Sequence, residues 1–288
     1  MVMSPRPPRQ RRRRMRTAKR LGATIRVPAA AARSSRTVMV AIYVKELIKK
    51  FGDRTAVSIP DFCFPSNEII GLVGNNGAGK TTLFRLILNL IKADSGIVNF
   101  CLTDENSQQD KANLDSNMTL VSHLEDAWKS YIAAYLDESF LIEFLTPKEF
   151  FTFIAKVNNI EEQEMEERLN SLQSFLGDEV LGRKVYIREL SAGNKQKVGI
   201  VAALLSCPKF VILDEPFNFL DPSSQNHLKK LLIEYKTKHK ASILISSHNL
   251  HHTTDISNRI VLMEKGEIIK NIDDVTEESI KELENYFL

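Results

Sequence analysis

Short apolar runs alternate with amphipathic stretches through most of the chain after residue 40. Three runs are continuously apolar or small and too short for helices, so they predict buried strands: residues 68–73, 210–213 and 242–247. Helices are predicted after or between them, at residues 83–91, from 190 to about 206, and at 223–238. This alternation predicts an α/β fold in which helices cover both faces of a mostly parallel sheet.

The flanking segments predict further strands and loops. Strands are expected at residues 40–44 and 55–64, at 93–98 after a turn, and in a hairpin at 260–269. Residues 103–118 are rich in Asp, Asn, Ser and Gln without an apolar period, which predicts a polar surface loop.

The pattern becomes helical over residues 132–190. Thr146, Pro147 and Glu149 form a capping-box pattern that begins a helix carrying Phe150, Phe151, Phe153 and Ile154. A second helix is predicted near residues 161–176 with Met165 on its apolar face and Gly177 after its end. We interpret these aromatic and apolar side chains as the core of a helical unit at about 139–190, inserted into the α/β body.

The net charge of +3 is the sum of a basic N-terminal segment and an acidic remainder of the chain. Residues 1–40 hold 12 of the 39 Lys and Arg residues and no acid, so 27 basic residues face 36 acidic ones in the remainder. The folded part is therefore acidic, which argues against nucleic-acid binding by it. Residues 1–38 are interpreted as a disordered basic tail: an RNA- or lipid-binding arm, a transit peptide, or the product of an upstream start codon with Met39 as the working first residue.

Two further observations restrict the class of protein. No uninterrupted apolar run reaches the length of about 18 residues that a membrane-spanning helix needs. The 3 cysteines are far apart and lack metal-site spacing, which favours a reducing, cytoplasmic setting over a disulfide-linked protein.

Between the strand at 68–73 and the helix after it lies the phosphate-binding pattern GxxxxGKT, from Gly74 to Thr81. Its glycines allow the backbone amides to approach phosphate oxygens closely, and the following helix directs its positive N-terminal end at the same anion. Lys80 is placed to contact the β- and γ-phosphates and the Thr81 hydroxyl to bind Mg²⁺. The loop residues predicted to contact nucleotide are Gly74, Asn75, Asn76, Gly77, Ala78, Gly79, Lys80, Thr81 and Thr82.

Polar side chains follow the two other buried strands. Asp214 ends the strand at 210–213, where a carboxylate is costly unless a cation such as Mg²⁺ faces it. Glu215 beside it is placed to orient or deprotonate a water molecule, and His248 follows the strand at 242–247. Because ligands bind at the carboxyl ends of parallel strands, we expect the three segments to converge on one crevice.

Together with these motifs, Leu190-Ser191-Ala192-Gly193-Asn194-Lys195-Gln196-Lys197 resembles the signature sequence of the ABC-type ATPases, and it lies 23 residues before Asp214. Residues 218–221 resemble the D-loop of that family, 247–248 its switch-histidine loop, and 134–138 occupy the position of its Q-loop. The resemblance covers about residues 40–275 and implies a P-loop NTPase core with an antiparallel β subdomain on its N-terminal side and an inserted helical subdomain.

The resemblance also implies roles for individual residues. Glu215 would be the catalytic base, His248 would contact the γ-phosphate beside Lys80, and Asp214 would lie on the metal side with Thr81. Phe51 would stack on adenine. Ser191 and Gly193 would reach ATP bound to a second ATPase subunit, identical or different, in a head-to-tail dimer. Asp221 of the D-loop is also expected to contact nucleotide. Glu138 stands where the family has Gln and is expected to meet nucleotide and Mg²⁺.

The resemblance implies an ATPase subunit that binds ATP and Mg²⁺ and drives a separate membrane permease docked on the helical unit, at the inner face of the cell membrane. The short helical unit resembles that of exporter-type subunits. A soluble ABC ATPase acting on ribosomes or nucleic acid is the alternative, although its relatives usually carry two cassettes or a long coiled coil. A binding module without turnover and a P-loop kinase explain fewer of the motifs.

Overall fold

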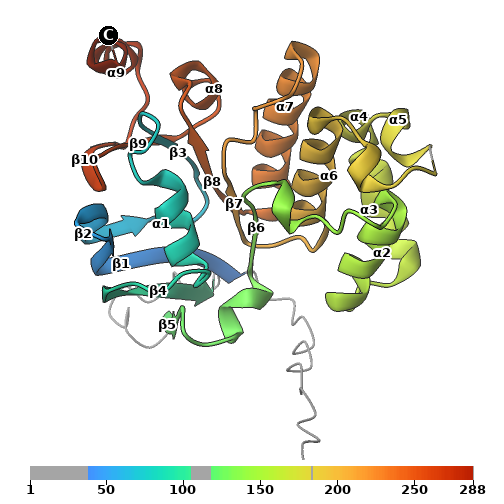
Figure 1. Ribbon diagram of the computed structural model, residues 1–288, viewed down its shortest axis with the longest axis horizontal. Coiled ribbons are helices and arrows are strands. Elements are labelled where there is room, and N and C mark those ends of the chain that lie inside the picture. The colour runs from blue at the N-terminus through green and yellow to red at the C-terminus, as the bar shows by residue number, and fades with distance from the viewer. Residues whose placement is uncertain (1–37, 105–117, 183, 288) are drawn as a thin grey trace, which may run out of the picture. The chain divides into compact units, whose positions relative to one another are not determined.

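A computed structural model describes residues 38–104, 118–182 and 184–287 of the chain (Figure 1). The basic tail predicted over 1–38 lies outside the described residues except at Val38, which already belongs to the first strand. Most of the polar loop predicted at 103–118 also lies outside them.

A six-stranded sheet lies at the centre, with its strands in the order β10–β9–β3–β8–β7–β6. Neighbouring strands are parallel except for β10, which pairs with β9 in the predicted hairpin. The strands are β3 (Ile69–Val73), β6 (Ile132–Tyr135), β7 (Phe210–Leu213), β8 (Ser242–Ser247), β9 (Arg259–Glu264) and β10 (Glu267–Ile272). The mostly parallel sheet predicted from the sequence is therefore confirmed.

Alternate side chains of the central strands enter two different cores. Helix α1 (Lys80–Ile87) lies against one face of the sheet, and α6 (Ala192–Leu205) and α7 (Pro222–His239) lie against the other (Figure 1). Val211 and Leu213 of β7 pack with α6 and α7, whereas Phe210 and Ile212 pack with α1. Because both faces are covered, the strand has to be apolar at every position.

A second, antiparallel sheet lies next to α1, in the order β2–β1–β4–β5 (Figure 1). Its strands are β1 (Val38–Phe51), β2 (Arg54–Phe64), β4 (Ser95–Asp104) and β5 (Met118–Ser122). The first residues of β2 reach the phosphate-binding loop, since a Cβ on Gly79 would lie only 2.4 Å from the Ala56 carbonyl oxygen.

The helical unit follows β6 and lies on the side of α6 and α7 (Figure 1). It contains η4 (Glu138–Phe140), α2 (Pro147–Val157), α3 (Glu162–Ser171), α4 (Gln173–Leu176), α5 (Asp178–Leu181) and η5 (Ile187–Glu189). The capping box is confirmed: the Glu149 amide donates to Thr146 Oγ1 over 3.3 Å, and the Thr146 amide donates to Glu149 Oε2 over 2.8 Å. The remaining elements are η3 (Ala127–Ser130), α8 (Leu250–Thr254) and α9 (Glu277–Phe287).

Four sequence predictions need correction. Residues 132–135 form a strand rather than the start of the helical region, because they pair with β7 along their length. Helix α1 ends at Ile87 and not at 91, and Asn89 then takes a left-handed conformation with φ 53°. The helix predicted at 161–176 is interrupted at Leu172 and continues as α4. Phe153 is 44% exposed and is not in the core, unlike Phe151.

No helix in the described ranges combines the length and the apolar character needed to cross a lipid bilayer.

Candidate functional site

The phosphate-binding loop connects β3 to α1 and is enclosed by backbone from two other strands. Gly77 and Gly79 have positive φ angles of 81° and 109°, which glycine adopts without a steric cost. A Cβ on Gly74 would lie 2.2 Å from the Met263 carbonyl oxygen of β9. Larger residues at Gly74 or Gly79 would force the loop away from β9 or β2, so these two glycines are needed for its shape.

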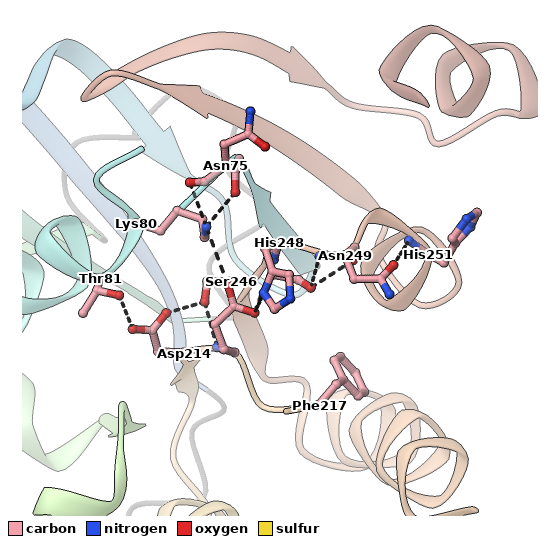
Figure 2. A network of polar contacts seen from close by, with 12 residues as sticks. Asn75, Lys80, Thr81, Asp214, Phe217, Ser246, His248, Asn249 and His251 are labelled. Carbon is pink, nitrogen blue, oxygen red and sulfur yellow. Dashed lines mark hydrogen bonds and ion pairs between the residues drawn. The ribbon is translucent and has the colours of Figure 1, made fainter. Parts of the chain in front are cut away.

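Lys80 is the first residue of α1 and is buried against the loop that precedes it. Its Nζ donates to the carbonyl oxygens of Gly74, at 2.7 Å, and Asn75, at 3.4 Å. The same ammonium lies 3.6 Å from Glu215 Oε1. Lys80 therefore connects the loop to the acidic segment after β7 (Figure 2).

Asp214 follows β7 and is 6% exposed. The Thr81 hydroxyl donates to its Oδ2 over 2.5 Å, and the Ser246 hydroxyl of β8 donates to its Oδ1 (Figure 2). Burial raises the pKa of Asp214, and these two hydrogen bonds oppose the rise only in part. A hydroxyl and a buried carboxylate whose charge lacks full compensation are oxygen ligands suited to Mg²⁺, so this pair fits the metal predicted from the sequence.

Glu215 is held by contacts with two other segments. Its amide donates to Ser246 Oγ over 2.8 Å, and its Oε2 lies 2.8 Å from His248 Nδ1 and accepts from the His248 amide over 3.2 Å. Gln196 of α6 donates from Nε2 to the Glu215 carbonyl over 3.2 Å. These contacts bring together the predicted base and the predicted histidine, with one carboxylate oxygen toward His248 and the other toward Lys80.

A cavity of about 380 Å³ lies over the loop. It is lined by Phe51, Arg54, Ala56, Asn76, Gly77, Ala78, Gly79, Lys80, Thr81, Thr82 and Glu215. Phe51 is 55% exposed, which leaves its ring available to a ligand at one end of the cavity. The predicted loop residues from Asn76 to Thr82, together with Phe51 and Glu215, therefore surround one space of a size that can hold a small ligand, whereas Gly74, Asn75, Asp214 and His248 are not among its lining residues.

Other predicted residues do not line this cavity. Ser191 is exposed and caps α6, with its hydroxyl accepting from the Asn194 amide over 3.3 Å. A Cβ on Gly193 would lie 2.6 Å from the Phe219 carbonyl, so the signature segment packs on the D-loop of the same chain. Asp221 caps α7 through the Ser224 amide, over 3.0 Å. Its pKa is lowered, mainly by the hydrogen bond from the Ser224 hydroxyl.

Glu138 also lies outside the cavity lining, on η4. Its Oε2 is 3.1 Å from Lys195 Nζ of α6, and Glu143 lies 3.8 Å from the same ammonium. The structure therefore places Glu138 with the signature helix rather than with Thr81 and Asp214.

Three residues that contribute to the site were not predicted from the sequence: Arg54, Gln196 and Ser246. Gln196 lies in the signature sequence, three residues after Gly193, and Ser246 lies in the predicted strand at 242–247, two residues before His248, so a local sequence signal exists for both. Arg54 follows Phe51 by three residues, but only the hairpin that turns its strand toward the loop gives it this position.

Comparison with known sequences gives a consistent result. Residues 57–218 match the family model described as ABC transporter. The uncharacterized ABC transporter ATP-binding protein YxlF of Bacillus subtilis (strain 168) is 31% identical over 225 residues, which cover 78% of this chain and 68% of YxlF. The methionine import ATP-binding protein MetN 3 of Bacillus anthracis is 30% identical over 228 residues, covering 79% of this chain and 63% of the relative.

Solved structures confirm the fold. An ATP-binding subunit of an ABC transporter is 26% identical with a TM-score of 0.66, over 85% of this chain and 93% of the other. The protein cbiO1 from Clostridium perfringens, part of the ABC transporter complex cbiONQ, is 24% identical with a TM-score of 0.62, over 85% and 90%. The dimeric ATP-binding cassette MJ0796 bound to ADP and Pi is 18% identical with a TM-score of 0.63, over 80% and 97%.

Proposed function

Because this chain belongs to the ABC transporter ATP-binding family, we propose that it hydrolyses ATP to ADP and phosphate and couples this reaction to a membrane-spanning permease. The observation that carries the proposal is the convergence of Thr81, Asp214 and the Glu215–His248 pair beside the phosphate-binding loop. These groups come from three separate strand ends, as expected of a site in a parallel sheet.

Each group has a chemical task in this proposal. Glu215 accepts the proton of the attacking water, and His248 holds the carboxylate in place through Nδ1. Lys80 and the loop amides stabilise charge on the transferred phosphoryl group, which is the main requirement of phosphoryl transfer. Mg²⁺, held by Thr81 and Asp214, would supply further neutralisation of that charge. Phe51 would stack on the adenine ring.

We further propose that two ATPase subunits, identical or different, form a head-to-tail dimer around two nucleotides. Ser191 is exposed and lies outside the cavity lining of its own chain, so its hydroxyl is accessible to nucleotide bound to a partner. The dimeric cassette MJ0796 with bound ADP and Pi supports this arrangement by its fold.

A cluster of exposed aromatic side chains supports docking of a permease on the helical unit. Phe140, Phe144 and Tyr186 are 48%, 70% and 43% exposed. The Arg188 guanidinium lies 5.5 Å from the Phe144 ring centroid and 5.1 Å from that of Tyr186. Exposed apolar surface of this kind is typical of protein interfaces, and aromatic and Arg side chains supply much of their binding energy. Through such a partner the chain would be held at the cytoplasmic face of the cell membrane.

The exporter-type role remains a prediction based on the short helical unit. The names of relatives do not favour it, since MetN 3 is named for methionine import.

The permease interaction is tested by purifying the tagged chain from its own cells in mild detergent. We expect a membrane-spanning protein to copurify, and Phe144→Asp to reduce its recovery at least about tenfold, because a charge would enter an apolar contact. Phe153→Asp is the matched control, since Phe153 is also an exposed Phe of the helical unit but is not one of the two rings over which the Arg188 guanidinium lies. Recovery of ribosomal particles or nucleic acid in place of a membrane protein would support the soluble alternative.

A further inference from the structure

One positively charged side chain that lines the cavity over the phosphate-binding loop, Arg54, does not belong to the ATPase motifs. Arg54 begins β2, directly across the hairpin turn from Phe51, with which it is paired. It is exposed and lines the same cavity as Phe51 and Lys80. Arg54 therefore shares one cavity with the ring expected to meet adenine and the loop expected to meet phosphate.

One contact fixes the guanidinium against the loop. Arg54 Nη2 donates to the Gly77 carbonyl over 3.1 Å. A Cβ on Gly77 would lie 3.2 Å from that nitrogen, so the glycine allows the guanidinium to approach this closely. Gly77 thus has a second role besides its positive φ of 81°.

Lys80 makes more contacts within the protein through its N–H donors than Arg54 does. Lys80 Nζ contacts two loop carbonyls and Glu215. A guanidinium carries five N–H donors, and within the part of the chain that the structure describes no carboxylate forms an ion pair with Arg54. Arg54 therefore has donors and an unneutralised charge directed at a cavity whose ligand would carry several negative charges.

We infer that Arg54 is a second phosphate-binding cation of this site, contacting the α- or β-phosphate of the bound nucleotide. This inference rests on the proposed nucleotide site and adds a residue to it. Arginine suits the task because its planar guanidinium donates two parallel hydrogen bonds to phosphate oxygens. Since the contact is to the α- or β-phosphate, ADP and ATP should depend on Arg54 equally.

The test measures dissociation constants of ADP and ATP by titration calorimetry for the whole chain and for Arg54→Ala and Arg54→Gln. We expect Arg54→Ala to weaken both nucleotides about tenfold, the size of one charge-assisted hydrogen bond at an exposed position. Arg54→Gln keeps an N–H donor on the side chain but has no charge, so it should bind as weakly as the alanine variant. Lys50→Ala, four residues away and outside the cavity lining, should bind like the wild type.

Three other outcomes would each overturn the inference. Wild-type affinity in Arg54→Gln would assign Arg54 to support of the loop through Gly77 and overturn the inference. Wild-type affinity in Arg54→Ala would overturn it as well. Failure of the wild-type chain to bind either nucleotide would overturn the proposed function, and this inference with it.

Discussion

The buried carboxylate of Asp214 suits the proposed metal site but is unfavourable for folding. It is buried at the end of β7 with two hydroxyl donors, and its pKa is raised because burial disfavours the charged form. At a pH between the pKa values of Asp214 in the unfolded and in the folded chain, the folded chain holds a proton that the unfolded chain has already released. Between the two pKa values the free energy of unfolding therefore falls as the pH rises.

Removing this charge should stabilise the unliganded protein. We expect Asp214→Asn to raise the Tm at pH 7 by about 3 °C, or about 1 kcal/mol, because a neutral amide costs less to bury than a carboxylate. The same variant should lose Mg²⁺-dependent ATP hydrolysis. Thermal unfolding between pH 4 and pH 8 measures the effect.

Asp221→Asn is the control for that measurement. Asp221 has a lowered pKa, so its contribution to stability has the opposite sign and is lost as the pH falls. A Tm for Asp214→Asn below that of the wild type across the whole pH range would contradict the account of Asp214.

Among the elements, those with strong patterns were predictable and those set by distant pairing were not. Strands β3, β7 and β8 coincide with continuous runs of apolar or small residues, and α2 begins at its capping box. Residues 132–135, which contain two alanines, were predicted to be helical. They form a strand because they pair with β7 at the sheet edge. The contact between Glu138 and Lys195 joins segments 57 residues apart, and no local pattern indicates it.

The contact between η4 and α6 carries its own prediction. Lys195 is held between two carboxylates, so we expect Lys195→Glu to lower ATP turnover about fivefold by shifting the signature helix, which corresponds to a coupling of about 1 kcal/mol. The reversed pair, Glu138→Lys with Lys195→Glu, should recover most of that loss. Turnover at saturating and at limiting Mg²⁺ is the measurement.

The alternative for Glu138 is the metal contact implied by the family resemblance. In that case the reversed pair would stay inactive, and Glu138→Lys alone would raise the Mg²⁺ concentration needed for half-maximal turnover. That result would contradict the charge pairing as the role of Glu138.

At the scale of the whole molecule, the site is assembled from segments far apart in the chain. The sequence was sufficient to predict the convergence of Lys80, Asp214, Glu215 and His248, because each stands just beyond a recognisable strand. It was not sufficient for Arg54, whose position depends on how the hairpin of β1 and β2 packs against the loop. Ser191 lies outside the cavity lining of its own chain, which leaves its proposed nucleotide contact to a second subunit.

The most direct test of the account is ATP turnover by Glu215→Gln beside the wild type, with the mass in solution measured in ATP and Mg²⁺. Glutamine keeps the shape of the side chain and a hydrogen-bonding partner for His248, but it cannot accept a proton. We expect turnover to fall at least about a hundredfold, the usual contribution of a general base, while an ATP-bound dimer accumulates. A variant that hydrolyses ATP at the wild-type rate as a monomer would contradict both the assignment of Glu215 and the proposed dimer.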